Sequence, residues 1–299
     1  MKKVLVTGTE GEVGSALLPQ LAKRFDATGF DIKPHGGAQK AVQGDLLRYA
    51  DIAAAAKGMD TIVHMAALLC REEQDLSIDI NVKATANVLQ AAVDKGVKRV
   101  VYCSTVWASG HGDTEPYLPI DEAVPCEPVC MYGQTKWLGE LMTEWYGRMH
   151  GLETVVIRFC GYHHVKVYSG DGSIDWGQAD IPGMFGRCLH AGHKLMNPVD
   201  LGEAFGLAAS KPGIAGQRFV VGVYTPYVSS DAAALKTARP VAIERCYPGV
   251  PALLAELGIG IPAMPYFFSH EKARAVLGFR CQHDLGDLAR LYREWKDAS

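Results

Sequence analysis

Short apolar runs alternate with amphipathic stretches along the first half of this 299-residue chain, and this alternation restricts the possible folds. Four of the runs are "KVLVTG" from Lys3, "DTIVHMAAL" from Asp60, "KRVVYCST" from Lys98 and "ETVVIRFC" from Glu153. They lack the apolar–polar alternation of a strand with one wet face, so we interpret them as strands buried on both faces. Stretches with helical spacing separate them. The order predicts an α/β fold built on a doubly wound parallel sheet.

Three glycines occupy the first predicted turn. Gly8, Gly11 and Gly14 lie in "TGTEGEVG", after the first strand and before the helical stretch "VGSALLPQLAKRF". A tight turn, the approach of a pyrophosphate to bare backbone, and close helix–strand packing each require a missing side chain. The helix N-terminus also offers free N–H groups to phosphates. The turn therefore predicts a dinucleotide-binding site on a Rossmann-type sheet.

Two acidic residues follow the next predicted strands. Asp31 ends "GFD", where a carboxylate can accept hydrogen bonds from both hydroxyls of the adenosine ribose. A carboxylate there repels the extra phosphate of NADP, so we predict NAD as the cofactor. Asp45 in "GDL" comes where an acid can meet the adenine edge.

The alternation ends near Tyr162. The next stretch, "HHVKVYSGDGSIDWGQADIPG", is polar and rich in glycine, which is more typical of a binding cleft or lid than of a core. We therefore predict a dinucleotide-binding domain made of residues 1–161 and 197–230. Residues 162–196 and 231–299 would form a smaller substrate-binding region.

Charge and hydropathy argue against several classes of partner. The formal net charge is −3, and no basic run suits nucleic acid or an anionic membrane. No stretch is long and apolar enough to span a membrane. The start, "MKKVLVTGTEGEVG", lacks the long apolar run of a signal peptide. We expect a cytoplasmic protein with a small-molecule substrate.

Cysteine spacing argues against a metal site. The eight cysteines include no C-x-x-C pair, which fits small core residues in a reducing compartment. Cys126 with Cys130, or Cys160 with His163 and His164, lack the second ligand pair that zinc needs. We predict that the protein holds no metal.

An ordered series of motifs resembles a known superfamily. After "TGTEGEVG", Asp31 and "GDL" come "HMAA" from His64, "YCST" from Tyr102, "DEAVPCEPVCMYGQTK" and "IRF" from Ile157. "NPVDLGEAF", "GQRFVVG" and "SHEKARAVLGF" continue the series. Together they resemble the extended short-chain dehydrogenase/reductase superfamily, which includes NAD-dependent sugar epimerases and dehydratases. The resemblance covers nearly the whole chain.

The resemblance implies a catalytic role for Tyr132, Lys136 and Thr105. Tyr132 and Lys136 lie one helical turn apart on the same face of a helix. A phenol with a pKa near 10 is a poor base at neutral pH, and a nearby ammonium favours the phenolate and lowers that pKa. Tyr132 would then be the general acid/base, Lys136 would also hold the nicotinamide ribose, and Thr105 would orient the substrate oxygen.

The superfamily's pattern also implies binding residues. For the substrate these are Ser104, Thr105, Tyr132, Gly161 and His163. For the cofactor they are Gly8, Glu10, Gly11, Glu12, Val13, Gly14, Asp31, Ile32, Asp45, Leu46, Met65, Ala66, Ala67, Asn81, Cys103, Tyr132, Lys136 and Phe159.

Two departures from the superfamily's subclasses bear on the reaction. Val106 and Trp107 follow Thr105, where sugar-nucleotide dehydratases place acids, so dehydration is not expected. Gly161 stands three residues after Arg158, where nucleotide-sugar epimerases typically carry asparagine. Three functions remain: an NAD-dependent dehydrogenase or reductase acting on a sugar-like or small hydroxy-carbonyl compound, a nucleotide-sugar epimerase that retains NAD, and a non-catalytic dinucleotide-sensing protein. The first is favoured.

The helix that carries Tyr132 has a further apolar face. "WLGELMTEWY" from Trp137 is apolar over more of its circumference than one buried stripe requires. The superfamily commonly pairs this helix with the one before it across a dimer interface. We therefore expect a homodimer.

Overall fold

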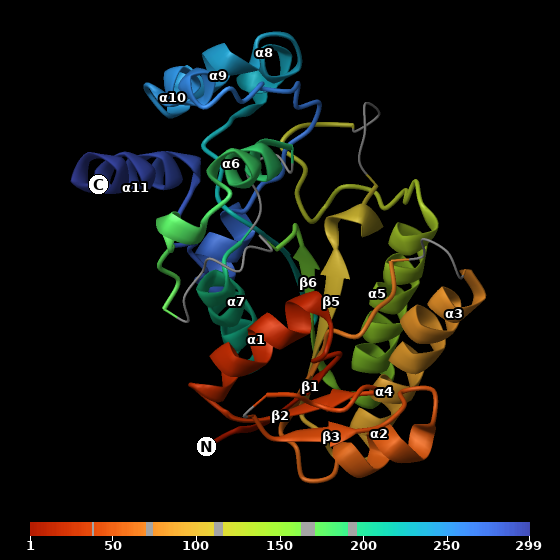
Figure 1. Ribbon diagram of the computed structural model, residues 1–299. Coiled ribbons are helices and arrows are strands. Elements are labelled where there is room, and N and C mark those ends of the chain that lie inside the picture. The colour runs from red at the N-terminus through yellow and green to blue at the C-terminus, as the bar shows by residue number, and fades with distance from the viewer. Residues whose placement is uncertain (38, 70–73, 111–115, 163–170, 191–195) are drawn as a thin grey trace.

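A seven-stranded parallel sheet forms the centre of the protein (Figure 1). The computed structural model describes residues 1–37, 39–69, 74–110, 116–162, 171–190 and 196–299. The strand order is β3-β2-β1-β4-β5-β6-β7, so the predicted α/β doubly wound sheet is confirmed. The strands are β1 (Lys3–Thr7), β2 (Asp26–Asp31), β3 (Ala41–Gln43), β4 (Thr61–His64), β5 (Arg99–Thr105), β6 (Glu153–Phe159) and β7 (Gln217–Val221).

Helices cover both faces of the sheet. The helices α1 (Glu12–Ala22) and α7 (Pro198–Ser210) pack against each other and against one face, with Leu17, Leu18 and Phe205 fully buried. The other face is covered by α2 (Tyr49–Ala55), α4 (Ala84–Asp94) and α5 (Met131–His150). Both faces are thus dry, which explains why the strand sequences are continuously apolar.

The structure differs from the local sequence patterns at three elements. The stretch "INVKATANVLQAAVDKGV" from Ile80 has the spacing of one long helix, but α3 (Gln74–Ile78) and a π-helical turn, η1 (Asp79–Lys83), precede α4. The stretch "PVCMYGQTKWLGELMTEWYGRMHG" from Pro128 also has helical spacing, but its helix begins at Met131, and the Sγ atom of Cys130 accepts a hydrogen bond from the N–H of Gly133. The edge strand β3 was missed, because its three residues are all exposed and give no burial pattern.

A second group of helices lies beyond the carboxyl ends of the strands (Figure 1). Their side chains, among them Phe185, Leu254 and Tyr292, form a separate buried cluster. No helix in the described part of the chain is long and apolar enough to cross a membrane. The helices of this group are α6 (Ile181–His190), α8 (Ala232–Thr237), α9 (Arg239–Cys246), α10 (Val250–Glu256) and α11 (Leu285–Ala298). Short helical turns in various parts of the chain are η2 (Val106–Ala108), η3 (Trp176–Gln178), η4 (Ser229–Asp231) and η5 (Ala273–Leu277).

Candidate active site

The glycine turn joins β1 to α1 where the strand order reverses. Gly8 has a φ of +77°, and a Cβ on it would lie 2.6 Å from the Cα of Ala66. A Cβ on Gly14 would lie 2.0 Å from the carbonyl oxygen of Gly8. Both glycines are therefore required by the fold itself.

Gly11 is different from the other two glycines. It is the N-cap of α1 and has an extended backbone conformation, and no side chain of its own caps the helix. Among the described residues, a Cβ on it would touch the carbonyl oxygen of Gly8 alone, at 3.3 Å. Bare backbone at a helix N-terminus suits a pyrophosphate, so this turn fits a dinucleotide.

Asp31 lies against the same turn. Its Oδ2 accepts a hydrogen bond from the backbone N–H of Glu10 at 2.9 Å, and its Oδ1 accepts one from Lys33 at 3.0 Å. The side chain of Glu10 contacts the ring of His35. The carboxylate of Asp31 is thus held at the end of β2, next to the turn that would hold the phosphates.

The remaining predicted cofactor residues surround this edge. Asp45 lies beside Asp31, because the N–H of Gly44 donates to the carbonyl of Asp31, and the Asp45 carboxylate accepts from Leu47. The side chain of Leu46 is in the core, so only its backbone can face a cofactor. Glu12 and Val13 begin α1, Ile32 is exposed after β2, and Met65, Ala66 and Ala67 follow β4.

Asn81 is fully buried in the π-helical turn η1. Its amide donates to the carbonyl of Leu68 at 2.8 Å and to the hydroxyl of Thr135 at 3.0 Å, and its oxygen accepts from the N–H of Leu68 at 2.8 Å. These bonds fix the loop after β4 to the helix that carries Tyr132. Direct contact of Asn81 with the cofactor stays a prediction.

Thr105, Tyr132 and Lys136 lie where β5 ends and α5 begins. Thr105 is the last residue of β5 and is 6% exposed; its hydroxyl accepts from the N–H of Trp107. Tyr132 is half-buried in the first turn of α5, and Lys136 follows one turn later. The strand and the helix place the three predicted catalytic residues at one edge of the sheet.

Lys136 is 1% exposed, and its burial lowers its pKa to about 8, although Cys103 and Glu140 oppose this effect. Burial also lowers the pKa of His64 to about 3, with Lys136 adding to the shift, so that ring is neutral. The neutral ring bonds Thr7 and Thr85. Of the two side chains, Lys136 is therefore the one that is charged at neutral pH.

A buried ion network joins α5 to the last two strands, and sequence reasoning missed its centre, Glu140. Glu140 is 0% exposed and binds Arg158 through both carboxylate oxygens at 3.0 Å, and Arg218 at 2.5 Å. The hydroxyl of Ser104 donates to the same carboxylate at 2.5 Å. Because Ser104 is bonded in this way, Thr105 is the better placed of the two to meet a substrate. The feature of the sequence that could have identified Glu140 is its position, one helical turn after Lys136.

The other predicted residues lie nearby or outside the described part of the chain. Phe159 ends β6 and packs edge-on against Phe205, and burial raises the pKa of Cys103 on β5 to about 11. Gly161 follows β6 with a φ of +149°, a conformation that residues with a side chain rarely adopt. His163 falls outside the described residues.

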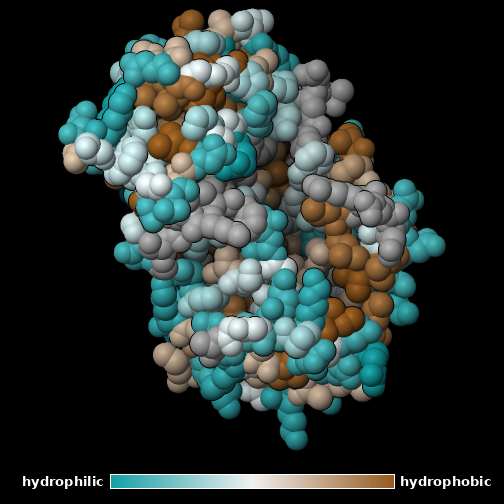
Figure 2. Space-filling view, in the orientation of Figure 1, coloured by the Kyte–Doolittle hydropathy of each residue, from teal (hydrophilic) through white to brown (hydrophobic). Residues whose placement is uncertain are grey.

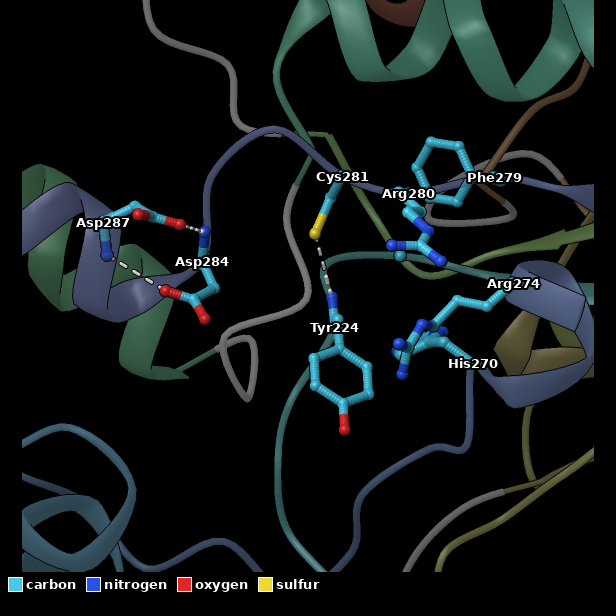
Figure 3. A pocket seen from close by; sticks show the side chains of 9 residues that line it. Tyr224, His270, Arg274, Phe279, Arg280, Cys281, Asp284 and Asp287 are labelled. Atoms are coloured by element: carbon cyan, nitrogen blue, oxygen red, sulfur yellow. Dashed lines mark hydrogen bonds between the residues drawn. The ribbon is translucent and has the colours of Figure 1, made fainter.

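A separate pocket of 180 Å³ opens beyond the end of β7 (Figure 3). Figure 3 shows His270, Arg274 and Arg280 on one side of it and Asp284 and Asp287 on the other. None of the predicted site residues lines this pocket, so it is not the predicted cofactor site. The described residues contain no group of three His, Cys, Asp or Glu side chains that could hold a metal ion.

Known proteins resemble the chain over different lengths. Residues 4–165 match the family described as the NAD dependent epimerase/dehydratase family. The N-acetyl-alpha-D-glucosaminyl-diphospho-ditrans,octacis-undecaprenol 4-epimerase of Escherichia coli O157:H7 is 33% identical over 153 residues, which cover 48% of this chain and 44% of that protein. The UDP-glucose 4-epimerase of Streptococcus mutans is 27% identical over 321 residues, covering 94% of this chain and 92% of that protein.

A solved structure matches almost the whole fold. A short-chain dehydrogenase/reductase superfamily protein from Agrobacterium tumefaciens, crystallised with bound NAD, has a TM-score of 0.72 and 22% sequence identity. The match covers 99% of this chain and 98% of that one. At this identity the likeness establishes the fold.

Proposed function

Because the chain belongs to the NAD-dependent epimerase/dehydratase family, we propose that it is an NAD-dependent dehydrogenase or reductase. The resemblance to the extended short-chain dehydrogenase/reductase superfamily is confirmed. The proposed reaction moves a hydride between NAD and the hydroxyl or carbonyl carbon of a sugar-like or small hydroxy-carbonyl compound. The observation that carries the proposal is the position of Thr105, Tyr132 and Lys136 beside the edge that bears the glycine turn.

Each of the three side chains has a distinct proposed task. In the oxidation direction Thr105 accepts or donates a hydrogen bond at the substrate oxygen and fixes its orientation. Tyr132 takes the hydroxyl proton as a phenolate, and Lys136 stabilises that phenolate and binds the nicotinamide ribose. Bound NAD would supply the hydride acceptor. In the reverse direction Tyr132 returns the proton.

The phosphates would bind at Gly11 and the ribose of the adenosine at Asp31, with Asp45 at the adenine edge. Residues 162–196 and 231–299 would form the substrate-binding region, and Gly161 and His163 would be among the residues that bind the substrate. The separate buried cluster beyond the strand ends supports this division for α6 and α8–α11, whereas Ala273, Leu277 and Phe279 pack in the core beside the sheet.

A nucleotide-sugar epimerase that retains NAD is the second candidate. The full-length similarity to a UDP-glucose 4-epimerase favours it. Gly161 argues against it, since its φ of +149° disfavours the asparagine that such epimerases typically carry there. A non-catalytic sensor is a weaker candidate, because a buried lysine with a lowered pKa costs stability that a scaffold would have no reason to keep.

One experiment separates the candidates. One sample of the purified protein is denatured and its retained NAD measured, and a second, native sample is incubated with NAD and a panel of free sugars, uronates and nucleotide sugars. A dehydrogenase produces net NADH with at least one free sugar or sugar acid. An epimerase retains NAD and converts a nucleotide sugar without net NADH. If no compound gives either result, the non-catalytic sensor is favoured.

A homodimer is part of the proposal. Leu138, Leu141, Trp145 and Met149 form a stripe along α5 and are 38–63% exposed. The brown patch on the right of Figure 2 lies over α5 and α3 and shows this apolar surface. A second copy that pairs the same helices would bury it. Light scattering tests this: Trp145→Glu should convert a dimer into a monomer, and a monomeric native protein would contradict it.

We also propose a cytoplasmic location. All seven cysteines that the structure describes are free, which suits a reducing compartment. Fractionation of cells that express the chain would test this.

A further inference from the structure

The ring of Tyr102 lies beneath the ammonium of Lys136. The Nζ atom is 4.3 Å from the ring centroid, within the range of a cation–π interaction. We propose that Tyr102 is a positioning residue for Lys136: its ring holds the ammonium in place for the phenolate of Tyr132 and the nicotinamide ribose. This inference rests on the proposed function and adds to it a residue that touches neither substrate nor cofactor.

Lys136 has no stronger partner among the described residues. Its ammonium makes no ion pair and no hydrogen bond with them, although the side chain is 1% exposed. The nearest carboxylate on its own helix, that of Glu140, is bonded to Arg158, Arg218 and Ser104 instead. The aromatic face is therefore what fixes the ammonium before a cofactor binds.

Tyr102 is itself held rigidly. It is 0% exposed on the central strand β5, and its hydroxyl lies 3.5 Å from the carbonyl oxygen of Lys136. The same hydroxyl lies against Gly139: a Cβ there would be 2.0 Å from the Tyr102 oxygen. A glycine inside a helix is destabilising relative to alanine, and the close approach of Tyr102 explains why one is present here.

The titratable neighbours of Lys136 and Tyr102 on β4 and β5 are uncharged at neutral pH. His64 on β4 is neutral, since burial lowers its pKa to about 3, and its ring lies 5.9 Å from that of Tyr102. Burial raises the pKa of Tyr102 well above 10 and that of Cys103 to about 11, so both stay protonated. On α5, the charge of Glu140 acts on Lys136, and Tyr132 acts on Tyr102.

Two substitutions at position 102 separate an aromatic role from a packing role. Tyr102→Phe keeps the ring face and loses only the hydroxyl, whereas Tyr102→Leu keeps an apolar side chain and loses the face. The measurements are the dissociation constant for NAD by calorimetry and the pH–rate profile. We expect Tyr102→Phe to stay within about twofold of native. Tyr102→Leu should weaken NAD binding roughly 2- to 30-fold, the range of cation–π contacts from exposed to desolvated. The limb of the pH–rate profile that Tyr132 sets should also move to higher pH, because the displaced ammonium stabilises the phenolate less.

If Tyr102→Leu unfolds, Gly139→Ala provides the second test, since it displaces the ring without altering it and should shift both readouts in the same direction. Native NAD affinity together with an unmoved pH limb in a folded Tyr102→Leu or Gly139→Ala protein would overturn the inference. Lys136→Met distinguishes this failure from that of the proposed function. If Lys136→Met also leaves turnover and NAD affinity unchanged, the role of the lysine itself is wrong.

Discussion

The carboxylate of Asp31 accepts a hydrogen bond from the backbone N–H of Glu10 at 2.9 Å, so the end of β2 is tied to the glycine turn. The two segments that would hold the ribose and the phosphates of one dinucleotide are therefore fixed to each other. In the proposed binding mode, this arrangement would place a negative charge where the extra phosphate of NADP would lie.

Replacing Asp31 should change the choice of cofactor. Native protein should prefer NAD over NADP, and Asp31→Ser should reduce the ratio of the two affinities, because the repelling charge is gone. Calorimetric titration with each dinucleotide measures this ratio. Asp26→Ser, at the other end of β2 and paired with Lys40, is the matched control and should leave the ratio unchanged. A native preference for NADP would refute the assignment.

Gly11→Val should abolish NAD binding while the fold survives. Among the described residues, a Cβ at this position has one close neighbour, the carbonyl oxygen of Gly8 at 3.3 Å, but in the proposed binding mode it would lie where the pyrophosphate approaches the backbone. NAD affinity and thermal unfolding of the cofactor-free protein are the two measurements. Gly260→Val, where a Cβ meets nothing within 4 Å, is the control. Unchanged affinity in Gly11→Val would show that the dinucleotide binds elsewhere.

Lys136→Met should stabilise the cofactor-free protein at pH 7. Burial lowers the pKa of Lys136 from 10.5 to about 8, so the folded state binds its proton less tightly than the unfolded state does. The cost is complete below pH 8 and disappears as the pH rises from 8 to 10.5. Chemical denaturation should show a gain on the order of 1–3 kcal/mol at pH 7, shrinking toward pH 10. The exposed Lys57→Met is the control, and a less stable Lys136→Met protein at pH 7 would count against the burial of a charged lysine.

Asp200 should make stability fall as the pH rises toward 7. The residue is 1% exposed on α7, burial raises its pKa to about 7, and its Oδ2 has no hydrogen-bond partner among the described residues. The folded state then holds a proton that the unfolded state releases above pH 3.8, so the cost grows between pH 3.8 and 7 and is complete above 7. Asp200→Asn keeps the oxygen that accepts from Gln282. Urea denaturation should show a larger gain for Asp200→Asn at pH 8 than at pH 4.5, and equal effects at both would refute the prediction.

Local sequence patterns predicted the parts of the site that one segment encodes. The spacing of Gly8, Gly11 and Gly14 and the continuously apolar strands each reflect a requirement within one turn or one strand, and the structure places them as expected. The partnership of Glu140 with Arg218 joins α5 to β7 across 78 positions, and no local pattern reports it.

The second half of the chain was harder to predict. Several of its helices are short, as in α8 with six residues and α10 with seven, and such segments carry little periodicity. The contact between Tyr102 and Lys136 likewise depends on the packing of α5 against β5. In the sequence, Gly139 is the residue that reflects this contact, and a single glycine in a helix has several explanations.

Tyr132→Phe tests the account most directly. The substitution removes one oxygen and keeps the packing of the ring, so the affinity for NAD should be nearly unchanged. With the substrate that the panel identifies, turnover should fall roughly 10²- to 10⁴-fold, the usual contribution of a general acid/base. The native pH–rate profile should show a group that titrates well below an ordinary tyrosine, and this limb should vanish in the variant. A Tyr132→Phe protein that keeps more than about a tenth of native turnover would contradict the catalytic role of Tyr132.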